Sequence, residues 1–247
     1  MSESGDKKVA LVTGANKGIG YETARQLAAK GITVLLGARD ARRGEEAASR
    51  LRAENFDVHF LRVDLTDAET HTSARRFIEE NFGKLDILVN NAGIALDFGV
   101  PASESAIEQW RATFETNVFG TISLTQKLLP LIKKSTAGRI VNLSSILASM
   151  QWSSNPDGGA GEFAYCGTAY NASKAAINMF TIHLANELKN TPIKVNAANP
   201  GWVRTEMGGE NAPLSAAEGA KTSVMLATLP EDGFTGRYVH LNEDLPW

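Results

Sequence analysis

Residues 8–20 read KVALVTGANKGIG, an apolar run followed directly by a glycine-rich turn and an amphipathic stretch. The run predicts a buried strand, and the stretch predicts a helix over Ile19–Lys30. In the turn, Gly14 permits a tight bend, Gly18 lets a pyrophosphate approach the backbone, and Gly20 allows the helix to pack closely on the strand. Free N–H groups at the start of the helix favour a phosphate. The turn therefore predicts a dinucleotide site, although glycines at this spacing also occur in ordinary turns.

The alternation of short apolar runs with longer amphipathic stretches continues along the chain. Strands are expected at 8–13, 32–37, 57–63, 85–89, 139–143, 193–197 and 237–241. Helices are expected at 19–30, 41–54, 68–82, 103–134, 168–189 and 216–229. Nearly continuous apolar strands separated by helices predict a parallel sheet covered on both faces. We therefore expect an α/β fold, a Rossmann-like doubly wound parallel sheet of about seven strands, in a single domain over residues 1–247.

Composition excludes several classes of partner. The chain has 247 residues, 43% of them hydrophobic, which is enough apolar material for a sizeable core. A net charge of −3 gives no electrostatic case for binding nucleic acid or an anionic membrane. No apolar run approaches the roughly 18 residues of a membrane helix, and the N-terminus is polar. The single cysteine, Cys166, suits a reducing compartment, so we expect a cytoplasmic protein with no nucleic-acid or membrane partner.

The residues after the second expected strand predict which nicotinamide cofactor is used. That strand ends in Gly37-Ala38-Arg39-Asp40, about 20 residues beyond the turn, where dinucleotide folds read the ribose. A cation there pairs with a 2′-phosphate, whereas a carboxylate accepts from a 2′-hydroxyl. Arg39 comes first and Asp40 is better explained as the N-cap of the next helix, so NADP is favoured over NAD. The alternative is that Arg39 is an ordinary surface residue.

Tyr170 and Lys174 are four residues apart in an expected helix and so project from one face. A nearby ammonium stabilises phenolate and is expected to lower the tyrosine pKa, which would make Tyr170 a usable general acid or base. Other polar residues follow expected strands or lie in the adjoining helix: Asp64, Asn90–Gly93 (NNAG), Asn117 and Ser144-Ser145. Each taken alone could be a cap, a turn or a solvated helix surface.

Taken together, these motifs resemble the short-chain dehydrogenase/reductase family over essentially the whole chain. The matching pieces are Thr13–Gly20, Asp64, Asn90–Gly93, Asn117, Ser144-Ser145, Tyr170–Lys174 (YNASK) and Pro200-Gly201. The resemblance implies that Tyr170 exchanges a proton with the substrate oxygen, which Ser145 positions. It also implies that Lys174 binds the nicotinamide ribose and tunes the tyrosine, and that Asn117 holds a water in a proton relay.

The resemblance and the turn together imply a set of residues that bind NADP(H). These are Gly14, Asn16, Lys17, Gly18, Ile19, Gly20, Arg39, Asp64, Leu65, Asn91, Ala92, Gly93, Tyr170, Lys174, Pro200, Gly201, Val203 and Thr205. No metal site is expected, because His59, His71, His183 and His240 are scattered. The gap of 25 residues between Ser145 and Tyr170 is longer than most of the family shows. An insertion there, together with the GANKGIG turn, resembles the carbonyl-reductase branch of the family. An insertion there can cover a helix face used for assembly, so monomer and homo-oligomer both stay open.

The sequence therefore predicts an NADPH-dependent reductase of ketones or aldehydes, with a small-molecule carbonyl substrate. Two alternatives stay open: an alcohol dehydrogenase that works in the oxidative direction, and a non-catalytic NADP-binding sensor. Two irregular segments, Met150–Gly167 and Arg204–Ser215, are expected as loops or lids beside the substrate. Apolar side chains that could line the pocket are Leu96, Phe98, Trp152, Trp202 and Met207.

Overall fold

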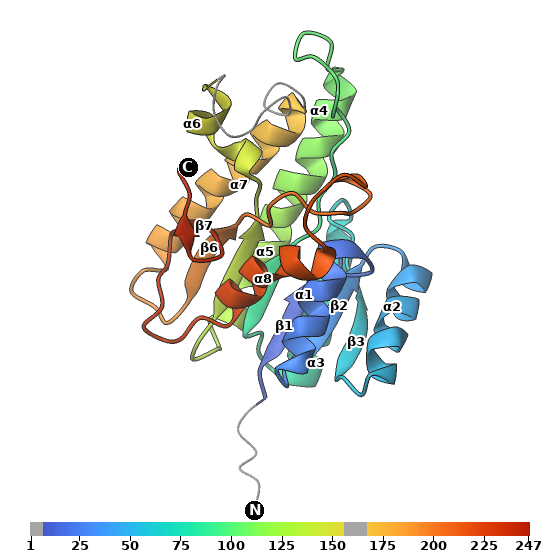
Figure 1. The fold of residues 1–247 in the computed structure, drawn as a ribbon. Helices are drawn as coiled ribbons and strands as arrows, with labels where there is room; N and C mark the ends of the chain where they lie inside the picture. The colour runs from blue at the N-terminus through green and yellow to red at the C-terminus, as the bar shows by residue number, and fades with distance from the viewer. Residues whose placement is uncertain (1–6, 156–166) are drawn as a thin grey trace, which may run out of the picture.

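A central sheet of eight strands organises the chain in the computed structural model, which describes residues 7–155 and 167–247 (Figure 1). The strands are β1 (Val9–Val12), β2 (Thr33–Ala38), β3 (Val58–Arg62), β4 (Ile87–Asn90), β5 (Arg139–Leu143), β6 (Lys194–Ala198), β7 (Tyr238–His240) and β8 (Glu243–Asp244). Their order is β3-β2-β1-β4-β5-β6-β7-β8, and every pair is parallel except β7 with β8. The predicted doubly wound parallel sheet is confirmed.

Helices cover both faces of this sheet. They are α1 (Gly18–Ala29), α2 (Ala41–Ala53), α3 (Ala68–Phe82), α4 (Ile107–Phe114), α5 (Thr121–Ile132), α6 (Met150–Ser153), α7 (Thr168–Glu187) and α8 (Ala216–Ala227), with short helical turns η1 (Glu115–Gly120) and η2 (Ile146–Ala148). On one face α1, α2 and α8 contribute apolar side chains to a single core, and α1 lies beside α8 (Figure 1). On the other face α3, α5 and α7 form a second core. Apolar residues on both faces explain why strands such as β2 are buried throughout.

Local signals in the sequence set several of the helix ends. The Asp40 carboxylate accepts a hydrogen bond from the Arg43 N–H at 2.9 Å, which confirms it as the N-cap of α2. Ser215 and Glu218 form a capping box at the start of α8. Gly83 ends α3 in the left-handed region, at φ +71°, where glycine meets no steric penalty.

The single long helix expected over residues 103–134 is wrong in two respects. Helix α4 begins only at Ile107, and the π-helical turn η1 separates it from α5. A Cβ on Gly120 would lie 2.1 Å from the Leu65 carbonyl oxygen, so the chain passes here too closely for any other residue. Asn117 lies within this π-helical turn, whose backbone is wound more widely than an α-helix. Such turns inside helices are frequent at functional sites.

Two other regions differ from the expectation. The segment Met150–Gly167 begins with helix α6, and its residues 156–166, which include Tyr165 and Cys166, lie outside the described residues. Strand β8 was not expected, because its two residues, Glu243 and Asp244, carry no apolar pattern. It pairs with β7 at the edge of the sheet.

The sheet order places the predicted site residues at one edge. Strand β1 lies between β2 and β4, so the chain leaves β1 toward one side of the sheet and later returns to the other side. Ligands bind in open α/β sheets at the carboxyl ends of the strands beside such a switch. The glycine-rich turn follows β1, the NNAG stretch ends β4, and Ser145 follows β5, so all three reach this carboxyl edge.

Candidate active site

The glycine-rich turn between β1 and α1 has the backbone geometry of a phosphate cradle. Gly14 and Gly18 have φ of +63° and +58°, a region that glycine enters freely. A Cβ on Gly14 would lie 2.9 Å from the Ala92 Cα, and one on Gly20 would lie 2.6 Å from the Gly14 oxygen. No side chain caps α1 at Lys17, which leaves its first-turn N–H groups to a ligand. These features fit a dinucleotide pyrophosphate.

The NNAG stretch holds this turn in place. The Asn91 amide donates a hydrogen bond to the Thr13 carbonyl at 2.8 Å. In return the Thr13 hydroxyl accepts from the backbone N–H groups of Asn91 and Ala92, each at 3.0 Å. The Asn91 side chain therefore fixes the turn itself. Its predicted contact with the ribose stays a prediction.

The residues expected at the adenosine end come together beyond β2 and β3. Burial raises the pKa of Asp64, but hydrogen bonds from Thr66 and the charge of Arg39 outweigh this and lower it overall. Arg39 is exposed directly after β2, within electrostatic reach of that carboxylate. The Leu65 side chain is buried in the core, so a contact of Leu65 with the cofactor is left to its backbone.

Tyr170 lies in the first turn of α7 with only 7% of its surface exposed. Burial raises the pKa of its phenol to about 12, against a lowering by a hydrogen bond from the Ser145 hydroxyl. The expectation of a lowered tyrosine pKa is therefore wrong for the protein alone. The cost of burying a phenolate exceeds the favourable contacts. The phenol stays protonated at neutral pH, as a proton donor requires.

The two neighbouring serines point to different places. The Ser145 hydroxyl reaches the Tyr170 phenol, whereas the buried Ser144 hydroxyl donates to the Asn178 side-chain oxygen at 2.6 Å. Only Ser145 meets the tyrosine, and it was the serine chosen from the sequence.

Lys174 lies one turn further along α7 and is 4% exposed. Its ammonium donates to the Leu143 carbonyl at the end of β5 at 2.8 Å and lies 5.7 Å from the centre of the Tyr170 ring. Burial lowers the pKa of Lys174 to about 8. At pH 7 the group still carries its charge about nine times in ten.

Asn117, in the π-turn η1, joins this group through its side-chain amide. The amide oxygen accepts from the Ile94 N–H at 2.8 Å, and the amide nitrogen donates to the Ile94 carbonyl at 2.8 Å and to the Ser173 hydroxyl at 3.0 Å. A Cβ on Gly93 would lie 3.3 Å from both the Asn117 oxygen and the Lys174 nitrogen. Glycine at 93 thus lets these two side chains approach each other. The expected water relay through Asn117 stays a prediction, and both of its amide N–H groups are already used.

The segment after β6 closes the site from the other side. The Asn199 side-chain oxygen accepts from the N–H groups of Ile146 and Gly201, at 3.2 and 3.3 Å, and so ties this segment to the one that carries Ser145. The Thr205 hydroxyl accepts from the Gly208 N–H at 3.1 Å. Asn199 was missed in the sequence, where only its place directly before Pro200-Gly201 could have indicated it.

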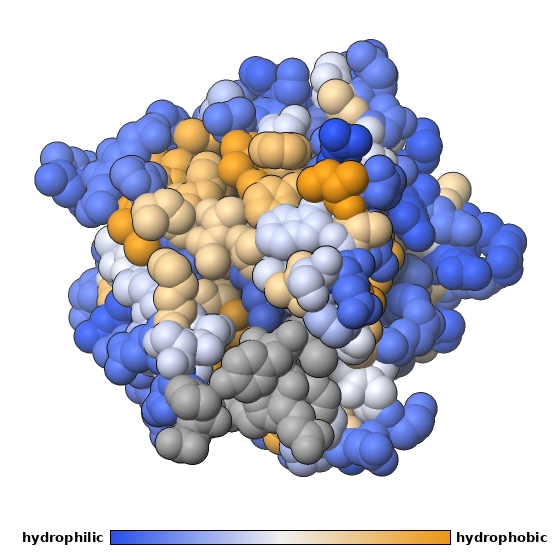
Figure 2. Space-filling view, turned by 90° about the horizontal axis from the view of Figure 1, so that it is seen from above, coloured by the Kyte–Doolittle hydropathy of each residue, from blue (hydrophilic) through white to orange (hydrophobic). Residues whose placement is uncertain are grey.

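Exposed apolar side chains border this edge of the sheet. Figure 2 looks down on the molecule from above and shows apolar residues gathered there within a polar surround. Large side chains exposed on the adjoining loops are Leu96, Phe98, Trp202 and Met207. Phe98 meets the Tyr170 ring edge to face, with the ring centres 5.1 Å apart. These side chains form an apolar surface beside Tyr170.

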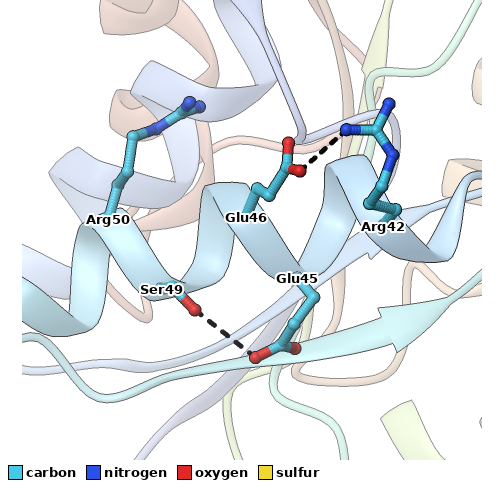
Figure 3. A pocket seen from close by; sticks show the side chains of 5 residues that line it. All are labelled: Arg42, Glu45, Glu46, Ser49 and Arg50. Carbon is cyan, nitrogen blue, oxygen red and sulfur yellow. Dashed lines mark hydrogen bonds and ion pairs between the residues drawn. The ribbon is translucent and has the colours of Figure 1, made fainter.

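A concavity on the outer surface of α2, shown in Figure 3, is lined by none of the residues of this site. Its side chains are charged or polar, with an ion pair of 2.8 Å between Arg42 and Glu46. Over residues 7–155 and 167–247, no three His, Cys, Asp or Glu side chains gather as metal ligands would. No helix in the same ranges has the length and apolar character needed to cross a membrane.

Comparison with known proteins gives consistent relatives. Residues 8–213 match the short chain dehydrogenase family. The chain is 36% identical to carbonyl reductase [NADPH] 1 of Mus musculus, covering 99% of this chain and 100% of that protein. The solved structure of salutaridine reductase from Papaver somniferum matches at 31% identity and a TM-score of 0.82, over 94% of this chain and 99% of that one. NADPH-bound carbonyl reductase from chicken fatty liver matches at 26% identity and a TM-score of 0.84, over 98% and 99%.

Proposed function

Because this chain belongs to the short chain dehydrogenase family, we propose that it uses NADPH to reduce the carbonyl group of a ketone or aldehyde to an alcohol. The comparisons confirm the expected family and its carbonyl-reductase relatives, which are named for NADPH. The observation that carries the proposal is the buried Tyr170 phenol at the carboxyl edge of the sheet, with Lys174 one turn along the same helix and Ser145 beside the phenol.

Tyr170, Ser145 and Lys174 have separate roles in the proposed reduction. When bound, NADPH supplies the hydride that adds to the carbonyl carbon. The Tyr170 phenol gives its proton to the carbonyl oxygen, so that negative charge on this oxygen is neutralised as it develops. The Ser145 hydroxyl holds the same oxygen. Lys174 would hold the nicotinamide ribose, and its positive charge favours the phenolate that Tyr170 becomes.

Cofactor choice depends on positive charge at the end of β2. Arg39 would pair with the 2′-phosphate of NADPH, and Lys17 lies in the turn before α1. The exposed Lys17 forms an ion pair with Glu206, which brings the loop after Pro200-Gly201 against that turn. The apolar side chains beside Tyr170 favour an apolar or aromatic carbonyl compound.

The test is a panel of ketones, aldehydes and quinones, assayed for loss of NADPH and of NADH absorbance and for the alcohol product. We expect turnover with NADPH, greatly reduced by Ser145→Ala. Ser144→Ala is the matched control, because this neighbouring hydroxyl bonds Asn178 and Tyr238 rather than Tyr170. Tight NADPH binding with no product from any carbonyl would contradict the proposal, and so would equal loss of activity in the two serine variants.

A further inference from the structure

A buried carboxylate, Asp97, stands at the amino end of the helix that carries Tyr170. It lies on the loop after β4, and its side chain is 0% exposed. Its oxygens accept from the Ala169 N–H at 2.7 Å and from the Tyr170 N–H at 3.4 Å. The Ser105 hydroxyl donates to it at 3.4 Å. These contacts link the loop directly to the backbone of the proposed proton donor.

Within the described residues, helix α7 receives this carboxylate in place of a side-chain cap from its own N-cap residue. Its N-cap residue is Gly167, at φ +83°, which has no side chain to accept from the first turn. Helices α2 and α3 differ, since Asp40 and Asp67 cap them from within the same segment. Unsatisfied N–H groups at a buried helix end are unfavourable, and a carboxylate there also interacts well with the helix dipole. Asp97, from another part of the chain, supplies the hydrogen-bond acceptor and the negative charge at this helix end.

The same residue fixes an aromatic ring against the tyrosine. Phe98 follows Asp97, and its ring meets the Tyr170 ring at 5.1 Å. A Cβ on Gly167 would lie only 2.5 Å from the Phe98 ring, so Phe98 packs over the start of α7 as well. Movement of Asp97 would therefore release the first turn of α7 and the ring beside Tyr170 together.

We propose that Asp97 is a positioning residue, which holds the first turn of α7 and Phe98 so that the Tyr170 phenol stays against Ser145. Asp97 is buried and acts through the Ala169 and Tyr170 N–H groups. This inference rests on the proposed function, in which Tyr170 is the proton donor. It adds a residue that has no counterpart among the motifs of the sequence.

The test compares Asp97→Ala and Asp97→Asn with variants of Asp86, which is the matched control. Asp86 is also buried, at 3% exposed, and also accepts from a backbone N–H (Val9, 2.9 Å) and a serine hydroxyl (Ser135, 2.5 Å). It lies directly before β4, at the opposite edge of the sheet. It also forms an ion pair with Lys84. Because Val9, Ser135 and Lys84 all lie outside α7, we expect loss of Asp86 to destabilise the fold without moving α7.

We expect Asp97→Ala to lower kcat for carbonyl reduction by about 10- to 100-fold, as misplacement of a reacting group does. The Kd of NADPH should stay within about twofold, since Tyr170 is only one of the many residues expected to hold the cofactor. Asp97→Asn keeps an oxygen acceptor and the size of the side chain, so it should fold and recover most of kcat. Asp86→Ala should lower the unfolding midpoint and leave kcat per folded molecule unchanged.

A second readout does not depend on activity. The NMR signal of ¹³C-labelled Tyr170, assigned with Tyr170→Phe, should shift in Asp97→Ala and stay in place in Asp86→Ala. An unmoved Tyr170 signal in Asp97→Ala, or equal losses of kcat in Asp97→Ala and Asp86→Ala, would overturn the proposal. If the wild type reduces no carbonyl compound, the proposed function fails, and the NMR comparison still decides whether Asp97 positions Tyr170.

Discussion

Replacing Lys174 by methionine should change how the stability of the cofactor-free protein depends on pH. The Lys174 ammonium is 4% exposed, and burial lowers its pKa from the ordinary 10.5 to about 8. Between these two values the unfolded chain binds more protons than the folded protein. The free energy of unfolding of the wild type therefore rises with pH in this range.

The size of the effect follows from the two pKa values. At pH 7 the buried ammonium costs the folded protein about 3 kcal/mol, and at pH 10 it costs about 1 kcal/mol. Methionine has a similar length and no charge, so Lys174→Met lacks this dependence. It also leaves the Leu143 carbonyl without its donor, at a cost of about 1–3 kcal/mol that is nearly the same at both pH values.

Urea unfolding of both proteins at pH 7 and pH 10, without cofactor, measures the difference directly. Relative to Lys174→Met, the wild type should gain about 2–3 kcal/mol between pH 7 and pH 10, because all other titrating groups are common to both. A constant difference between the two proteins would mean that the Lys174 ammonium is not desolvated. The reasoning about the site would then be refuted.

Three further substitutions test other parts of the site. Arg39→Asp should move preference from NADPH toward NADH by about 10- to 100-fold, measured by titration with each cofactor, and unchanged NADPH affinity would contradict the assignment. Asn117→Ala removes the hydrogen bonds to Ile94 and should lower the free energy of unfolding by about 3 kcal/mol together with kcat; a loss of less than about 0.5 kcal/mol would show that these bonds matter little. Glu206→Gln removes the ion pair of Lys17 and should tighten NADPH binding by about two- to fivefold with no change for NADH. Equal changes for both cofactors would show that Glu206 does not compete with the 2′-phosphate for Lys17.

The fold was predictable because its signals are local and repeated. Buried strands such as β1 show as continuous apolar runs, and helix α3 begins and ends at the expected residues because Asp67 and Gly83 are ordinary cap residues. The π-turn η1 was not predictable. It depends on the packing of Gly120 against Leu65, a contact between segments far apart in the chain.

In the site too, features set by local sequence were predictable, and features set by contacts between distant segments were not. Tyr170 and Lys174 could be paired from their spacing, and Ser145 could be chosen from the family resemblance; the structure brings the three together. The rise in the Tyr170 pKa could not be predicted from the sequence, because it depends on burial by the surrounding chain. Asp97 could not be found either, since a single aspartate in a loop gives no sign that it meets the backbone of a distant helix.

The most direct test of the central claim is turnover by Tyr170→Phe with NADPH and a carbonyl compound that the wild type reduces. NADPH affinity should be measured in the same preparation. The account predicts that kcat falls by about 100- to 10,000-fold, the usual contribution of a positioned proton donor, while the Kd of NADPH stays within about twofold. A variant that keeps a tenth or more of the wild-type kcat would show that the proton comes from another group.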